Sequence, residues 1–94
     1  MTGTTPVRVL LPTHLRSYTA GEAEVEVEVE THGRTLGDVL AVLEARHPGL
    51  RVRIVDEQDR IRPHIKVFVA GEQALDLGVP VTGEVQIIAA LSGG

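Results

Sequence analysis

The sequence contains no cysteine, a single lysine and no long apolar run, and each absence limits the chemistry available to the chain. Without cysteine it cannot form a disulfide, a thiolate metal site or a cysteine nucleophile, and it cannot carry sulfur or an acyl group on a thiol. A membrane-spanning helix needs about 18 consecutive apolar residues, so the short apolar runs predict no membrane partner. No charged-then-apolar signal peptide opens the sequence, and we therefore expect a cytoplasmic protein.

The charge balance argues against nucleic acid and anionic membranes as the main partners. Nine lysines plus arginines stand against thirteen aspartates plus glutamates, which gives a net charge of −4. The 94 residues, of which 43% are hydrophobic, are enough for a single domain, 1–94, with one modest core.

Two strands are predicted in the first third of the chain. The clearest pattern is in residues 24–30, where three valines alternate with four glutamates, so that one face is apolar and the other acidic. Residues 7–11 predict an earlier strand, preceded by a frayed lead-in at residues 1–6. Residues 12–22 between the two strands read as a long connection.

An amphipathic helix follows Thr35, which is a typical N-cap residue. Asp38 stands three residues later, at the acidic position of a capping box. Pro48 and Gly49 stop the helix. Its apolar residues have the spacing of one helical stripe: Leu36, Val39, Leu40 and Leu43.

The second half of the chain predicts further strands at residues 65–69 and 84–90. Residues 51–55 fit either a short helix or a strand, and the charged residues 56–60 fit a surface loop. Residues 75–78 fit a loop or a very short strand. The order is two strands, one helix and two or three strands, which predicts an α+β fold on a single sheet.

Motifs of the common enzyme classes are absent from the sequence. It contains no phosphate-binding G-x-x-x-x-G-K-[ST], no G-x-G-x-x-G, no G-x-S-x-G and no H-E-x-x-H. The alternating glutamates could bind a basic partner, but a solvated strand face that discourages edge pairing is the favoured interpretation. Without the phosphate- and dinucleotide-binding motifs we expect no bound cofactor. We also expect no metal site, because the four histidines lie in separate segments: His14, His32, His47 and His64.

The last two residues, Gly93 and Gly94, have a specific chemical use. Glycine has no Cβ, so a diglycine end can thread a narrow channel and lets an enzyme's backbone approach closely. Its unhindered carboxylate also suits activation as an acyl adenylate. By itself, the diglycine fits an incidental flexible terminus equally well.

Taken together, the order of elements and the terminal diglycine resemble the ubiquitin-like β-grasp fold. Within that fold the chain resembles the bacterial sulfur-carrier family, which includes the small subunit of molybdopterin synthase and the sulfur carrier of the thiamine pathway. The Leu-Pro-Thr-x-Leu-Arg loop at residues 11–16 is most similar to carriers of the actinobacterial cysteine-biosynthesis branch. The resemblance rests on residues 11–21, 35–39, 65–69 and 87–94.

This resemblance implies a mixed sheet of four or five strands with one main helix crossing one face, and a last strand that lies parallel to the first, between its neighbours. It also implies a separate activating enzyme that uses ATP to adenylate the Gly94 carboxylate. A sulfur donor then displaces AMP and leaves a thiocarboxylate for a sulfur-accepting biosynthetic enzyme. Gly93, Ser92 and Leu91 would form the flexible tail that threads the enzyme. The protein itself would be a monomer and no enzyme.

Strand alternation predicts a docking patch for the partners. If the odd-numbered residues of 65–69 face the helix, Phe68 faces away from it, and Ile88 likewise faces outward if Ile87 faces in. With Ala90 they would form an apolar patch beside the tail, unless residues 51–55 or the early loop cover it. The predicted core comprises Val7, Val9, Val25, Val27, Val29, Leu36, Val39, Leu40, Leu43, Val67, Val69, Val85 and Ile87.

Other functions remain compatible with the sequence. The chain could be the small subunit of molybdopterin synthase, or a ubiquitin-like modifier joined through Gly94 to lysines of target proteins. The single lysine, Lys66, would limit chain building by such a modifier. It could also be a plain interaction module. The residues do not identify the sulfur acceptor.

Overall fold

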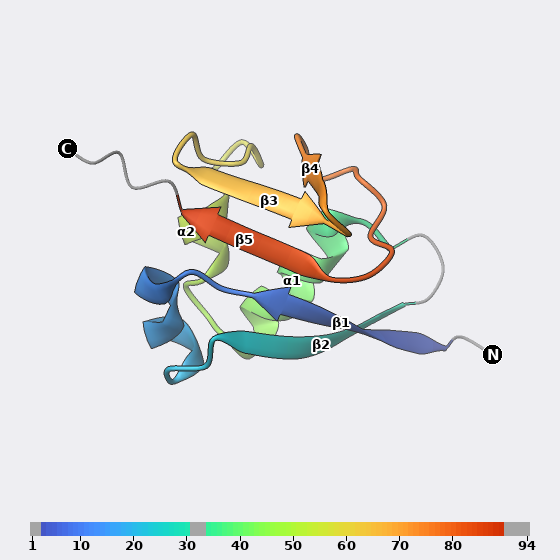
Figure 1. Cartoon of the computed structure of the whole chain (residues 1–94), viewed down its shortest axis with the longest axis horizontal. Coiled ribbons are helices and arrows are strands. Elements are labelled where there is room, and N and C mark those ends of the chain that lie inside the picture. Colours follow the sequence, from blue (N-terminus) through green and yellow to red (C-terminus); the bar gives the residue numbers. More distant parts are fainter. Residues whose placement is uncertain (1–2, 31–33, 90–94) are drawn as a thin grey trace.

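The computed structural model describes residues 3–30 and 34–89. Its sheet has five strands, and helix α1 crosses one face of it (Figure 1). The elements in chain order are β1 (Thr4–Leu10), the 3-10 helix η1 (Thr13–Thr19), β2 (Glu24–Glu30), α1 (Leu36–Arg46), α2 (Arg51–Ile54), β3 (Ile65–Val69), β4 (Glu72–Ala74) and β5 (Val85–Ala89).

The strand order is β2-β1-β5-β3-β4. Strands β1 and β5 are parallel, with Leu10 opposite Gln86, and the other neighbouring pairs are antiparallel. The expected mixed sheet, with its last strand parallel to the first and between its neighbours, is therefore confirmed. The carboxyl ends of β1 and β5 consequently lie at the same end of the sheet.

Helix α1 begins at the predicted cap. The Thr35 hydroxyl accepts the amide hydrogen of Asp38 at 3.3 Å, and the Thr35 amide donates to the Asp38 carboxylate at 2.9 Å. This reciprocal pair is a capping box. The apolar stripe of the helix is buried against the sheet.

The predicted core residues are buried except Val25, which is only half-buried. Val25 lies near the start of β2, beside a hollow bounded by η1 and the carboxyl end of α1, so the helix does not cover it fully. The structure adds buried residues that lie mostly in short elements and connections: Leu11, Leu15, Leu50, Ile54, Val55, Ala74 and Val81.

The structure corrects the start of the first strand and decides between the alternatives for residues 75–78, which form a loop. Strand β1 begins at Thr4, so the lead-in is not frayed throughout: residues 4–6 pair with β2. Pro6 is tolerated because the described residues pair with β1 at that point only on the β2 side. A short strand lies at Glu72–Ala74 and not at residues 75–78, since Ala70 and Gly71 have positive φ values of 50° and 87° and form a tight hairpin turn.

The ambiguous segment 51–55 is helical over Arg51–Ile54, and Glu44 of α1 holds its start. The Glu44 carboxylate accepts the amide hydrogens of Gly49 at 2.9 Å and Arg51 at 2.8 Å. These two bonds, the first of them foremost, lower the pKa of Glu44 below its usual value of 4.5, with a smaller contribution from the Arg51 charge. The carboxylate thus ties α1 to α2.

We expect Glu44→Gln to reduce stability at neutral pH and to flatten its loss in acid. A carboxyl whose pKa is lower in the folded state stabilises the protein above its unfolded pKa, and that contribution disappears as the pH falls through the folded value. Urea unfolding between neutral pH and pH ~3 measures this. Glu57→Gln, in the exposed loop, is the control; equal pH profiles for wild type and Glu44→Gln would contradict the prediction.

Candidate functional site

The face of the sheet opposite α1 carries three apolar side chains on β1, β3 and β5, interspersed with Gln86 and Lys66. The register places Phe68 and Leu10 opposite Gln86 on either side, and Lys66 opposite Ile88. Ile88 is 38% exposed and Phe68 is half-buried, so neither is buried beneath residues 51–55 or the early loop. Leu10, Phe68 and Ile88 are hereafter called the outer patch.

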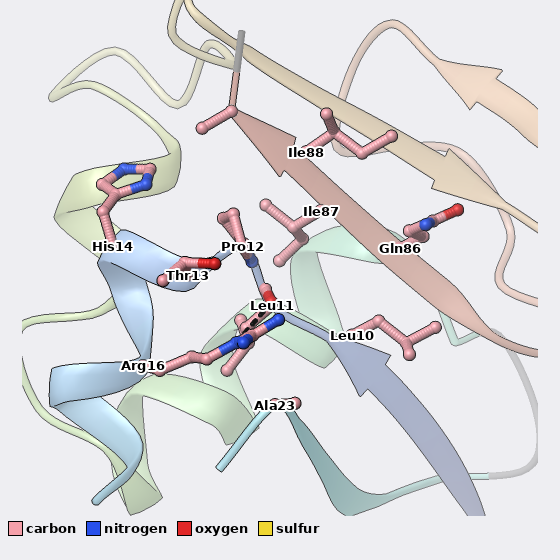
Figure 2. Close-up of a pocket in the computed structure, with 11 residues that line it drawn as sticks. Leu10, Leu11, Pro12, Thr13, His14, Arg16, Ala23, Gln86, Ile87 and Ile88 are labelled. Atoms are coloured by element: carbon pink, nitrogen blue, oxygen red, sulfur yellow. Dashed lines mark hydrogen bonds between the residues drawn. The ribbon is translucent and has the colours of Figure 1, made fainter. Parts of the chain in front are cut away.

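A groove of about 580 Å³ opens next to the outer patch, at the carboxyl end of β5 (Figure 2). One side is the end of β5 and the other is the loop that leads from β1 into η1. Ala90 and the predicted tail residues Leu91, Ser92, Gly93 and Gly94 follow Ala89 but lie outside the described residues. The lining residues are Leu10, Leu11, Pro12, Thr13, His14, Arg16, Ala23, Gln86, Ile87, Ile88 and Ala89.

The loop side of the groove is held by its own hydrogen bonds. The Pro12 carbonyl accepts the Leu15 amide hydrogen at 3.0 Å, and Nε of Arg16 donates to the Leu11 carbonyl at 3.2 Å. Leu15 is buried, and the buried Thr19 hydroxyl donates toward the carbonyl oxygens of Arg16 and Glu22. The Leu-Pro-Thr-x-Leu-Arg sequence therefore builds a defined wall. Sequence reasoning missed the groove, although Pro12 signals where β1 must end.

Charge is distributed unevenly around the groove. Among the described residues its lining contains the guanidinium of Arg16 but no aspartate or glutamate, whereas the exposed face of β2 is acidic. Arg8 lies between the two regions and pairs with Glu24 at 3.8 Å and Glu84 at 3.5 Å. The groove at the carboxyl end of β5 is thus mainly apolar, with the positive charge of Arg16 at its side.

The described residues contain no group of three histidine, aspartate or glutamate side chains that could hold a metal ion. His14, His47 and His64 lie in separate segments, and His32 falls outside the described residues. Over residues 3–30 and 34–89, no helix is long and apolar enough to cross a membrane.

Comparison with known proteins places the fold and the site in context. No family model matches the chain, and no curated protein matches it. Among solved structures, a chain of the Amycolatopsis orientalis BexX/CysO complex is 32% identical, with a TM-score of 0.80 over 94% of this chain and 99% of that chain. Haloferax volcanii SAMP1 is 30% identical, with a TM-score of 0.77 over 96% of this chain and 100% of that chain. Mycobacterium tuberculosis CysO is 28% identical, with a TM-score of 0.76 over 90% and 99%.

The sheet topology, the single crossing helix and these likenesses define a ubiquitin-like β-grasp protein. The chain belongs to the β-grasp family of sulfur carriers and small modifiers that includes CysO and SAMP1. Members of this family are carriers or modifiers, and the protein is accordingly not an enzyme.

Proposed function

We propose that this protein is a sulfur carrier whose Gly94 carboxylate is activated by an adenylating enzyme of the ubiquitin-activating type. The observation that carries the proposal is the similarity to CysO over nearly the whole chain. The position of β5 supports it: its carboxyl end borders both the groove and the outer patch. Gly94 follows Ala89 by five residues, which span at most about 18 Å when extended.

The proposed reaction has two displacements and no redox step. A Gly94 carboxylate oxygen attacks the α-phosphorus of ATP, and pyrophosphate leaves. Hydrosulfide then attacks the acyl carbon, the bond to the AMP oxygen breaks, and AMP leaves with the bonding electrons. Because the chain has neither a phosphate-binding loop nor a thiol, the activating enzyme supplies the ATP site and the sulfur travels on the main-chain terminus. Because the proposed activation step consumes ATP, we propose that the protein works in the cytoplasm.

The chain's own part is to present that terminus. Gly93, Ser92 and Leu91 would thread the enzyme's channel, where the absence of a Cβ at Gly93 allows close approach. The outer patch, extended by Ala90, would dock first on the activating enzyme and then on a sulfur-accepting biosynthetic enzyme. The similarity to CysO favours an acceptor in cysteine biosynthesis.

Incubation with an activating enzyme, ATP and sulfide, followed by intact mass measurement, tests the function. A mass gain equal to one oxygen-to-sulfur exchange supports the sulfur carrier. The 30% identity to SAMP1, a small archaeal modifier protein, favours protein modification as a second candidate. Higher-mass conjugates in cell extract would support the modifier, and an unchanged mass in both assays would leave a plain interaction module.

We expect Ile88→Glu to weaken binding to the activating enzyme by about tenfold, because it puts a charge into the centre of an apolar interface. The fold should persist, since Ile88 points outward from the sheet. Val52→Glu is a matched control: Val52 is 49% exposed, but it lies on α2 and not on the three strands that carry the outer patch. Binding measured by titration calorimetry should be unchanged in the control; equal weakening in both variants would contradict the patch.

A further inference from the structure

Strand β5 is paired on both sides over its first half and on one side over its second half. On the β3 side the register continues to Ala89. On the β1 side it ends at Leu10↔Gln86 within the described residues, because the chain turns at Pro12 into η1. Residues 87–89 therefore present an open strand edge to the groove (Figure 2).

The pairing with β3 shows which main-chain groups face the groove. In antiparallel strands, hydrogen-bonded and non-hydrogen-bonded pairs alternate. The Ala70 amide donates to the Glu84 carbonyl at 3.0 Å, so the hydrogen-bonded positions of β5 are the even-numbered residues that follow Glu84. The main-chain groups of Ile87 and Ala89 therefore point away from β3 and toward the groove.

Pro12, two residues beyond the end of β1, stands where a longer β1 would satisfy these groups. If the parallel ladder continued past Leu10, the residue at position 12 would donate to the Ile87 carbonyl and accept from the Ala89 amide. Proline has no amide hydrogen, and the Pro12 carbonyl already accepts the Leu15 amide. The Ile87 carbonyl and the Ala89 amide thus have no strand partner among the described residues.

The side chains around this open edge fit an extended chain segment with negative charge. Leu10, Pro12 and Ile88 provide apolar walls, and no carboxylate lines the groove although the chain has thirteen aspartates and glutamates. No carboxylate of the described residues lies within ion-pair distance of Arg16, whose Nε is bound to the Leu11 carbonyl. An acidic side chain could pair with the guanidinium from within the groove.

We propose that the groove binds an extended acidic segment of the partner protein, which adds to the open edge of β5 as a short strand. Its main chain pairs with the Ile87 carbonyl and the Ala89 amide, and its carboxylate faces Arg16. Strand addition of this kind takes its affinity from main-chain hydrogen bonds and its specificity from side-chain contacts. The inference rests on the proposed function only in naming the activating enzyme as that partner. The added strand would be hydrogen-bonded to Ala89, the last described residue before the segment that leads to Gly94.

The test is NMR titration of the ¹⁵N-labelled full chain with the peptide acetyl-Thr-Val-Glu-Val-Thr-amide. We expect the Ile87, Ile88 and Ala89 signals to shift and exchange of the Ala89 amide hydrogen to slow by about tenfold. The analogue with lysine in place of glutamate should bind at least about fivefold more weakly. Peptides that leave these signals unmoved, or that bind equally well, would overturn the proposal. Slow exchange of the Ala89 amide hydrogen in the dilute protein without peptide would also overturn it, because the chain itself would then fill the groove. Slow exchange that appears only as the protein concentration rises would overturn it too, because a second copy of the chain would then fill the groove.

Two variants separate the groove from general effects on folding. Arg16→Glu should lower the affinity for the acidic peptide and for the activating enzyme about tenfold. Arg46→Glu changes the net charge equally and also removes one side-chain bond to a carbonyl, that of Glu26, but should leave both affinities unchanged. Ala89→Pro removes the amide hydrogen that faces the groove and should abolish peptide binding while the remaining amide spectrum stays dispersed.

The same experiments distinguish this inference from the sulfur-carrier function. The peptide arm needs neither ATP nor an intact Gly94 carboxylate, so groove binding without thiocarboxylate formation would overturn only the carrier function. If all three proteins (wild type, Arg16→Glu and Ala89→Pro) form the thiocarboxylate and bind the activating enzyme equally well, only the proposal that this enzyme binds in the groove is overturned.

Discussion

A protein that lacks Gly93 and Gly94 is expected to unfold at the same temperature as the full chain and to form no thiocarboxylate. Among the described residues the buried core runs from Val7 to Ile87, and Gly93 and Gly94 follow it in the sequence. The new terminus at Ser92 falls short of the acyl position by two residues, which is about 7 Å in an extended chain. Thermal denaturation and intact mass after incubation with an activating enzyme, ATP and sulfide measure the two effects.

Two further variants make the result specific to position 94. Gly94→Ala keeps a carboxylate at the same reach, but the added methyl group restricts φ and crowds the channel, so we expect intermediate activation. One residue added after Gly94 should block transfer, because the acyl carbon of Gly94 is then in a peptide bond. If the truncated protein is thiolated as well as the full chain, the diglycine has no role and the sulfur-carrier proposal fails.

Val27→Asp is expected to unfold the domain. Val27 is fully buried in β2, opposite Val7 and beneath α1, and the variant places an unpaired carboxylate in that core. Such a change costs more than ~4 kcal/mol, which approaches the whole stability of about 5–15 kcal/mol that a domain possesses. Circular dichroism and urea unfolding at pH ~7, where the introduced carboxyl is ionised in the unfolded chain, measure the loss.

The adjacent residue provides the control for this variant. Glu26 is exposed on the opposite face of β2, across from Arg8, and Glu26→Lys should cost less than ~1 kcal/mol. Similar destabilisation by the two substitutions would mean that the inner and outer faces of β2 are wrongly assigned.

The sequence alone determined those elements whose signal is local. The alternation of residues 24–30 predicts β2 with its correct bounds and faces, because strand side chains alternate between the two faces of a sheet. Thr35 and Asp38 predict the start of α1, because the capping box closes within four residues of chain. The diglycine is likewise visible only as sequence, and its role stays a prediction.

The tertiary structure decided what depends on contacts between distant segments. Leu15, Leu50 and Ile54 are buried in or beside the short helices η1 and α2, where burial is set by what the sheet and α1 cover and not by any local period. The hairpin at β4 escaped prediction because its strand has only three residues, too few for an alternation to stand out. The groove arises because β1 leaves the sheet at Pro12 while β5 continues to Ala89. Strands β1 and β5 lie far apart in the sequence, so which of them extends further is defined only once their parallel register has formed.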